Sequence, residues 1–153
     1  VNRPKRKLIY LPSKSATGYL SYCEEVGCDW EGLQNSIPEK FDTAAILELP
    51  EFLQENGYSN IASGVEVPLD YSKPLPDGYR IAELPECTML YFQSEPYDNP
   101  DDFGKYIGQV FKAIDHYDFE RYGYVLANNV APSFNLGADT RTGARIAIPV
   151  KEK

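Results

Sequence analysis

The chain has 153 residues, 42% of them hydrophobic and 25% charged, and its 23 acidic and 15 basic side chains give a net charge of −8. This length and balance are typical of one globular domain that folds without disulfides. The negative charge disfavours direct binding to the phosphate backbone of nucleic acids. The chain shows no signal-peptide pattern and no apolar run of about 18 residues, which predicts a cytoplasmic protein without membrane contact.

Potential metal ligands and nucleophiles are few and scattered. The cysteines are Cys23, Cys28 and Cys87, without a C-x-x-C motif, and His116 is the only histidine. A zinc site would need nearly all four side chains to converge, and one histidine excludes most Ser-His-Asp and Cys-His schemes. The sequence therefore predicts no metal, no cofactor and no disulfide framework.

The N-terminal segment is basic. Residues 1–7 (VNRPKRK) are predicted to be a tail or the end of a linker, and residues 8–13 an extended lead-in. Residues 16–25 are predicted to form a strand, because Tyr19 and Tyr22 favour β structure and Gly27 closes the segment.

A short helix is predicted next, with Asp29 as its N-cap and Pro38 limiting its end. Its apolar face repeats at helical spacing and consists of Trp30, Leu33 and Ile37. Residues 44–49 and 61–67 are predicted strands, separated by a turn at Asn56-Gly57.

The second half begins with a loop over residues 68–78, which hold three prolines and an Asp-Gly pair. Residues 79–93 are predicted to form a long strand that is broken near Pro85. A helix over residues 100–117 follows, capped by Asn99. Its apolar stripe is Phe103, Ile107, Val110, Ile114 and Tyr117.

Two final strands are predicted over residues 133–136 and 144–150, around a turn at 137–143. The element order is then β-α-β-β twice, which predicts an α+β fold of two βαββ units related by a pseudo-twofold, with antiparallel sheets. The cleft between two such units is a common place for a ligand.

Three segments of the chain resemble the GyrI-like effector-binding domains that often follow the helix-turn-helix part of AraC-type transcription regulators. They are YLSYCEEVGCDWEGL (19–33), GVEVPLDYSKPLPDGYRIAELPECTMLYFQ (64–93) and APSFNLG…GARIAIPVK (131–151). The resemblance covers residues 8–151. It implies an effector-binding domain over 8–153, a cleft for small aromatic or cationic molecules, and DNA contact only through a helix-turn-helix domain that would precede residues 1–7.

One position departs from the pattern of the family. Many relatives place a glutamate on the last strand shortly before the IPVK-like ending, where it faces the ligand. The nearest counterpart here is Arg145. Either Glu66 or Glu24 supplies an acid from another strand, or the cleft prefers a neutral or anionic ligand.

The candidate ligand-binding residues are acidic, aromatic or basic side chains on the predicted elements: Tyr22, Glu24, Trp30, Glu66, Tyr91, Phe134 and Arg145. Acidic and aromatic side chains together suit a cation, and Arg145 suits a carboxylate. Each has an alternative. Glu66 faces either the cleft or solvent, Trp30 covers the cleft or anchors its helix, and Arg145 could instead pair with Asp139.

Three functions stay open from the sequence. The first is a sensor domain that binds a small-molecule effector and changes the state of an attached DNA-binding domain. The second is a stand-alone inhibitor of another protein, whose acidic surface meets a basic partner. The third is a hydrolase using Glu66 with Tyr22 or Tyr91. We expect the first, a binding domain that is not an enzyme and that could form a homodimer.

Overall fold

The computed structural model describes residues 1–27, 29–139 and 143–153, and for 137–139 only the backbone is described. All strands belong to one curled antiparallel sheet in the order β1-β6-β9-β8-β3-β4-β2-β5, with β7 paired to β9. The strands are β1 (Asn2–Arg3), β2 (Arg6–Pro12), β3 (Ala45–Glu48), β4 (Ile61–Val67), β5 (Arg80–Leu84), β6 (Cys87–Gln93), β7 (Tyr124–Leu126), β8 (Ser133–Asp139) and β9 (Gly143–Glu152). The helices are α1 (Tyr19–Val26), α2 (Asp29–Asn35), α3 (Phe103–His116) and the short 3-10 turns η1 (Glu51–Leu53), η2 (Pro100–Asp102) and η3 (Glu120–Tyr122).

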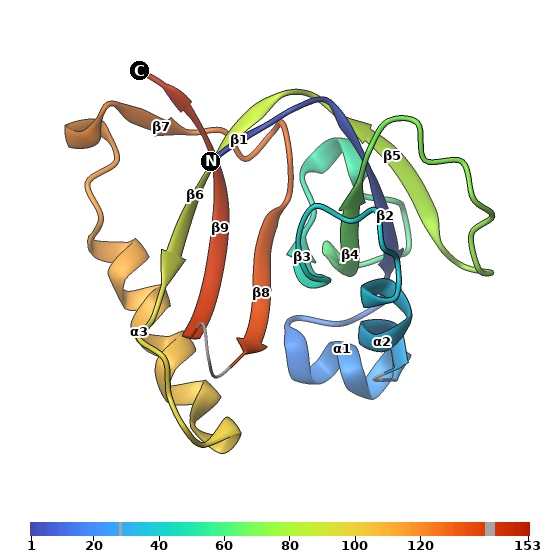
Figure 1. Ribbon diagram of the computed structural model, residues 1–153, viewed down its shortest axis with the longest axis horizontal. Coiled ribbons are helices and arrows are strands. Elements are labelled where there is room, and N and C mark those ends of the chain that lie inside the picture. Colours follow the sequence, from blue (N-terminus) through green and yellow to red (C-terminus); the bar gives the residue numbers. More distant parts are fainter. Residues whose placement is uncertain (28, 140–142) are drawn as a thin grey trace.

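The fold consists of two halves with the same element order, as predicted. The first half is β2, α1 and α2, β3 and β4, and the second is β6, α3, β8 and β9. Strands β3 and β8 join the halves side by side at the centre of the sheet, where Leu47 lies opposite Phe134. Figure 1 shows α1 and α2 on one side of this seam and α3 on the other.

Each half contributes one strand that pairs with a strand of the other half. Strand β1 leads into β2 but pairs with β6, and β5 leads into β6 but pairs with β2. The predicted long strand over 79–93 is therefore two strands that belong to different halves and separate at Pro85. Residues 1–7, which were expected to be a tail or linker, provide β1 and the start of β2, and Arg6 is fully buried.

The prediction of a strand over residues 16–25 was wrong, because these residues form α1. The Ser21 hydroxyl accepts hydrogen bonds from the backbone N–H groups of Thr17 (2.9 Å) and Gly18 (3.1 Å), which satisfies free donors before the first turn. The apolar residues Tyr19, Tyr22 and Val26 pack on one side at helical spacing. The first strand of the unit is instead β2, over the expected lead-in.

The other predicted elements are confirmed with small shifts of their ends. These are α2, β3, β4, the loop over 68–78, α3 and the last two strands. Asn99 acts as a cap, because its side chain accepts a hydrogen bond from the backbone N–H of Asp101 (3.0 Å) at the start of η2. Part of the predicted turn at 137–143 lies outside the described residues.

The two faces of the sheet bury different clusters. On the helix side, Tyr22 of α1 and Trp30 of α2 pack with Ile46 of the sheet, while Val110 of α3 packs with Ile146. The opposite, inner face holds the largest cluster: Leu8, Tyr10, Ala45, Leu47, Leu49, Leu53, Ala62, Leu84, Met89, Ala131, Phe134, Leu136 and Ala147. No helix in the described ranges is long and apolar enough to cross a membrane.

A buried chain of hydrogen bonds holds α1 and α2 to the sheet. The Tyr22 hydroxyl donates to the Leu11 carbonyl (2.7 Å) and meets the Ser63 hydroxyl (2.8 Å), which also accepts from the Gln34 amide (2.7 Å). Burial raises the pKa of Tyr22 to about 12, because an anionic phenolate would lose its hydration there.

Replacing Tyr22 with phenylalanine should cost about 1 kcal/mol of unfolding free energy at neutral pH, since one buried bonding group is lost. A pKa raised on folding stabilises the protein fully below the pKa of the unfolded chain, and this contribution is lost as the pH rises towards about 12. The difference between wild type and Tyr22→Phe in urea unfolding should therefore shrink above a pH of about 10. A difference that stays constant with pH, as expected for the exposed control Tyr122→Phe, would contradict this assignment.

Candidate ligand-binding cleft

A cleft of about 710 Å³ opens between α1 and α3, over the seam where the two halves meet. Its floor comes from β3, β4, β8 and β9, and its walls come from the two helices and the turns before them. The lining residues are Thr17, Gly18, Tyr19, Leu20, Ile46, Leu47, Glu48, Ile61, Asp101, Phe103, Gly104, Ile107, Phe111, Ile114, Ser133, Phe134, Asn135, Ile146 and Ile148.

The floor follows from the register of the central strands. Ile46 lies opposite Asn135, which in turn lies opposite Ile146. Because side chains alternate along a strand, Ile46 and Glu48 share the helix side of the sheet, as do Ser133 and Asn135. The floor is therefore mostly branched aliphatic, with a polar line along β8.

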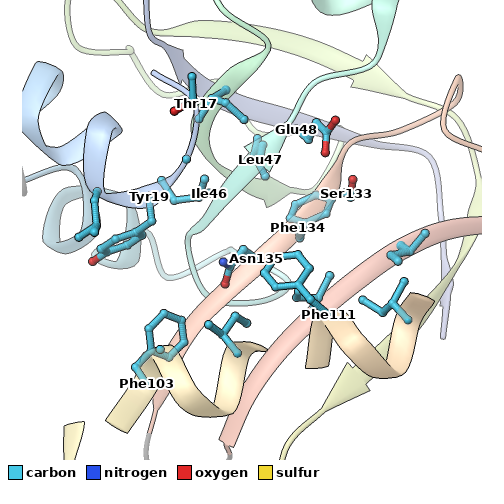
Figure 2. Close-up of a pocket in the computed structure, with 18 of the residues that line it drawn as sticks. Thr17, Tyr19, Ile46, Leu47, Glu48, Phe103, Phe111, Ser133, Phe134 and Asn135 are labelled. Carbon is cyan, nitrogen blue, oxygen red and sulfur yellow. The ribbon is translucent and has the colours of Figure 1, made fainter. Parts of the chain in front are cut away.

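The walls are aromatic and leave large apolar groups in water. Tyr19 comes from α1, while Phe103 and Phe111 come from α3 (Figure 2). At the lips, Leu20 is 76% exposed and Phe111 is 51% exposed. A ligand that buries these side chains removes apolar surface from water, which favours binding by about 25 cal/mol per Å².

The charges of the cleft lie at its edges. Glu48 and Asp101 are exposed, whereas Ser133 and Asn135 are half-buried. No lysine, arginine or histidine is among the described lining residues. Among all the residues that the structure describes, no group of three His, Cys, Asp or Glu side chains could hold a metal ion. The cleft can thus bind an apolar body but offers no evident catalytic constellation.

One predicted site residue, Phe134, is among the residues that line the cleft, although it alternates with Ser133 and Asn135 and packs with Leu47 in the inner cluster. Tyr22 of α1 and Trp30 of α2 are buried between the helices and the sheet, outside the cleft lining, in edge-to-face contact with ring centroids 5.8 Å apart. Trp30 therefore anchors α2, the second of the two readings that its position left open. Glu24 is exposed on α1 and is not among the lining residues.

The remaining three, Glu66, Tyr91 and Arg145, gather on the inner side of the sheet, away from the cleft. Glu66 is 6% exposed and accepts a hydrogen bond from Arg6 Nε, while Arg3 Nε lies 3.5 Å from its other oxygen. Arg6 also donates to the Pro85 carbonyl (2.6 Å). The buried acid therefore has two cationic partners of its own.

Asp42 completes this group and ties the two halves together. The Tyr91 hydroxyl donates to Asp42 Oδ2 (2.9 Å), and Arg145 Nη2 donates to Asp42 Oδ1 (3.3 Å). Arg3 Nη2 donates to the Tyr91 hydroxyl (2.5 Å). Asp42 belongs to the first half, whereas Tyr91 and Arg145 lie on β6 and β9 of the second. We refer to Arg3, Arg6, Asp42, Glu66, Tyr91 and Arg145 as the inner polar network.

Burial dominates the titration of this network. It raises the pKa of Glu66, although the neighbouring Arg6 guanidinium opposes that rise. Burial, reinforced by the Asp42 carboxylate, also raises the pKa of Tyr91 to about 12. The pairing of Glu66 with Tyr22 or Tyr91 that a hydrolase would need does not occur in the cleft. Arg145 pairs with Asp42, and the side chain of Asp139 lies outside the described residues.

Sequence reasoning missed most of the lining. Tyr19 and Leu20 were assigned to a strand, and no residue of the predicted stripe of α3 was named as a candidate ligand-binding residue. The available signal was Phe111, an aromatic residue on α3 outside the predicted stripe. Glu48 ends β3 on the same face as Ile46, but that face could not be identified without the pairing partner of the strand.

Solved structures of low sequence identity share this fold. One is SAV2435 bound to tetraphenylphosphonium, with a TM-score of 0.59, 17% identity, and coverage of 99% of this chain and 92% of that chain. Another is a Staphylococcus aureus MU50 protein proposed to act in bacterial transcription regulation, with a TM-score of 0.51, 16% identity, and coverage of 99% and 95%. The sequence matches no family model and no curated protein.

Proposed function

We propose that this chain is the effector-binding domain of a bacterial transcription regulator and that it binds a lipophilic, aromatic small molecule in the cleft between α1 and α3. The observation that carries the proposal is the cleft itself: about 710 Å³, aliphatic at its floor and aromatic at its walls. This size and lining suit a drug-sized ligand. Ligand binding in one of the proteins of the same fold supports the proposal.

The regulator is proposed to be of AraC type, on the resemblance to GyrI-like domains. DNA would then be contacted through a helix-turn-helix domain joined to residue 1. The role in transcription regulation that has been proposed for the second protein of the same fold is in keeping with this. The cleft lies at the seam of the halves, so a ligand that contacts α1 and α3 together would bias their relative placement and thereby the state of an attached domain.

A cleft-filling substitution tests the proposal. A β-carbon added at Gly104, on the α3 wall, meets no atom within 4 Å, so a larger side chain can leave the helix there without a clash at its first atom. In wild type, tetraphenylphosphonium or neutral triphenylphosphine oxide at about 100 times its Kd should stabilise by about 2.7 kcal/mol, a rise of several degrees in Tm. Gly104→Trp should abolish the rise because its indole occupies the cleft.

The matched control is Ala113→Trp, at an exposed position of α3 that is not part of the cleft lining. It should keep the full ligand-induced rise in Tm. Both variants should melt cooperatively without ligand, which separates a blocked cleft from an unfolded protein. Equal ligand shifts in the two variants, or no shift in wild type with any lipophilic compound, would refute the proposed site.

A further inference from the structure

A second, smaller cavity lies beside α2 in the first half of the fold. Its volume is about 140 Å³, and it is bounded by β2, the C-terminal end of α2 and the loop over residues 68–78. Its described lining shares no residue with the cleft between α1 and α3. Most of the lining is aliphatic, aromatic or proline, and Ile9, Ile37, Leu75 and Tyr79 belong to one packed cluster there. We refer to this space as the α2 cavity.

Gln34 is the buried polar residue of this lining, and its neighbours determine which end of its amide is bonded. The Tyr22 hydroxyl donates its single hydrogen to the Leu11 carbonyl (2.7 Å), so the hydrogen between Tyr22 and Ser63 (2.8 Å) belongs to Ser63. Ser63 Oγ can then only accept from Gln34, and the group that donates to it at 2.7 Å is the amide nitrogen Nε2. The amide oxygen of Gln34 is therefore the end that this chain of hydrogen bonds leaves without a donor.

Gln34 Oε1 is buried and has no hydrogen-bond partner among the residues that the structure describes. A buried acceptor without a donor destabilises the folded state, and most such groups in proteins are bonded to protein atoms or to ordered water. Because Gln34 lines the α2 cavity, a molecule held there can supply the donor. An apolar cavity of about 150 Å³ holds benzene, so the α2 cavity has room for one six-membered ring.

We propose that the α2 cavity is a second ligand site, which binds small monocyclic aromatic molecules with one neutral O–H or N–H donor, the class of phenols and anilines. The ring packs against Ile9, Ile37 and Leu75, and the donor bonds Gln34 Oε1. A ring without a donor fills the same space but leaves this oxygen unpaired, so the donor sets the selectivity. A charged ligand is disfavoured, because no Asp, Glu, Lys, Arg or His is among the described residues of the lining.

Methyl-resolved NMR on wild type locates the ligand. Phenol should shift the methyl signals of Ile9, Ile37 and Leu75, which line the α2 cavity. The methyl signals of Ile46 report on the cleft between α1 and α3 instead. Gly104→Trp, a change in the cleft lining, should leave the three α2-cavity shifts as they are in wild type. The proposal is overturned if phenol moves none of these three signals.

The Kd values of phenol and fluorobenzene, two rings of nearly the same size, are then measured from the shift of the Ile9 methyl signals. Phenol should bind wild type about fivefold more tightly, the size expected of one net hydrogen bond. Equal Kd values for the two compounds would overturn the proposal and mean that a water molecule is the donor to the Gln34 oxygen.

Two methionine variants test the acceptor itself. Gln34→Met removes the amide oxygen and keeps the length of the side chain, so it should bind phenol and fluorobenzene equally. The matched control is Gln54→Met, the same change at an exposed position outside the cavity, which should keep the fivefold preference. A preference that persists in Gln34→Met would contradict the role of this oxygen. Because Gln34→Met also loses the bond to Ser63, its cooperative melting is checked first, and if it does not fold the comparison of the two compounds on wild type decides.

Discussion

Replacing Arg6 with methionine is expected to lower the free energy of unfolding by about 3–5 kcal/mol at neutral pH. The Arg6 side chain is fully buried and bonds Glu66, which is itself 6% exposed. Breaking one partner of a buried pair leaves an incompletely compensated charge, which accounts for the size of the effect. Urea unfolding followed by circular dichroism measures it. A loss below about 1 kcal/mol would show that Arg3, 3.5 Å from Glu66, suffices as a partner.

The double variant Arg6→Met/Glu66→Leu separates lost pairing from lost packing. Because both charges are removed together, it should regain most of the stability that Arg6→Met loses. Some deficit should remain, since the Pro85 carbonyl loses the donor that Arg6 provided at 2.6 Å. A double variant no more stable than Arg6→Met would mean that the arginine acts mainly through its packed side chain.

The pH dependence of Arg6→Met gives an independent check. Burial already raises the pKa of Glu66 and Arg6 opposes the rise, so removing Arg6 should raise the pKa of this carboxyl further. A raised pKa means that the folded state favours the protonated carboxyl. The contribution of this group to the free energy of unfolding is therefore fully present below its pKa in the unfolded chain, and it is lost as the pH rises through its pKa in the folded protein. The variant should therefore be less destabilised, relative to wild type, at a pH near 4 than at pH 7.

The inner polar network also shows why the sequence could predict the strand β4 but not which of its side chains face the helices and which face the inner side of the sheet. The alternation Val65-Glu66-Val67 predicted that Glu66 points away from the valines, and it does. Nothing in the pattern says which side of the strand carries the helices. That depends on β4 pairing with β2 and β3, and on Arg6, from the expected basic tail, entering the sheet to meet the acid.

Element types were predictable where periodicity was strong. The spacing from Phe103 to Ile114 identified α3, and the segment IASGVEV over 61–67, which follows the Asn56-Gly57 turn, identified β4. The prediction for the segment that forms α1 was wrong because tyrosines, considered one at a time, favour strands. The spacing of Tyr19, Tyr22 and Val26 taken together is that of a helix. The exchange of β1 and β5 between the halves has no local sequence signal, since it depends on contacts between residues far apart in the chain.

The departure at Arg145 has a structural counterpart. Arg145, the nearest counterpart of the glutamate that the resemblance would place facing a ligand, instead bonds Asp42 on the inner side of the sheet. The cleft-facing neighbour on β9 is Ile146. The floor of the cleft at this position of β9 is therefore aliphatic rather than acidic.

Replacing Gly143 with alanine is the second change expected to have a large effect. Gly143 has a φ of +85°, a conformation that costs an alanine about 1 kcal/mol or more. An added β-carbon would also lie 2.4 Å from the Ser94 carbonyl oxygen and 2.9 Å from that of Glu95, both of them backbone atoms. The Ser94 backbone N–H donates a hydrogen bond to the Ala144 carbonyl (2.8 Å), which keeps the backbone at Ser94 close to Gly143.

Gly123 supplies the matched control, because it has the same φ of +85° but open space around an added β-carbon. Gly123→Ala should therefore show the conformational cost alone, about 1 kcal/mol, whereas Gly143→Ala should lose about 2–4 kcal/mol by urea unfolding. Equal losses in the two variants would mean that β6 and β9 separate easily at this end. Since β9 supplies Ile146 and Ile148 to the cleft floor, a yielding junction would loosen one edge of that floor, and the close approach at Ser94 argues that this edge is held in place.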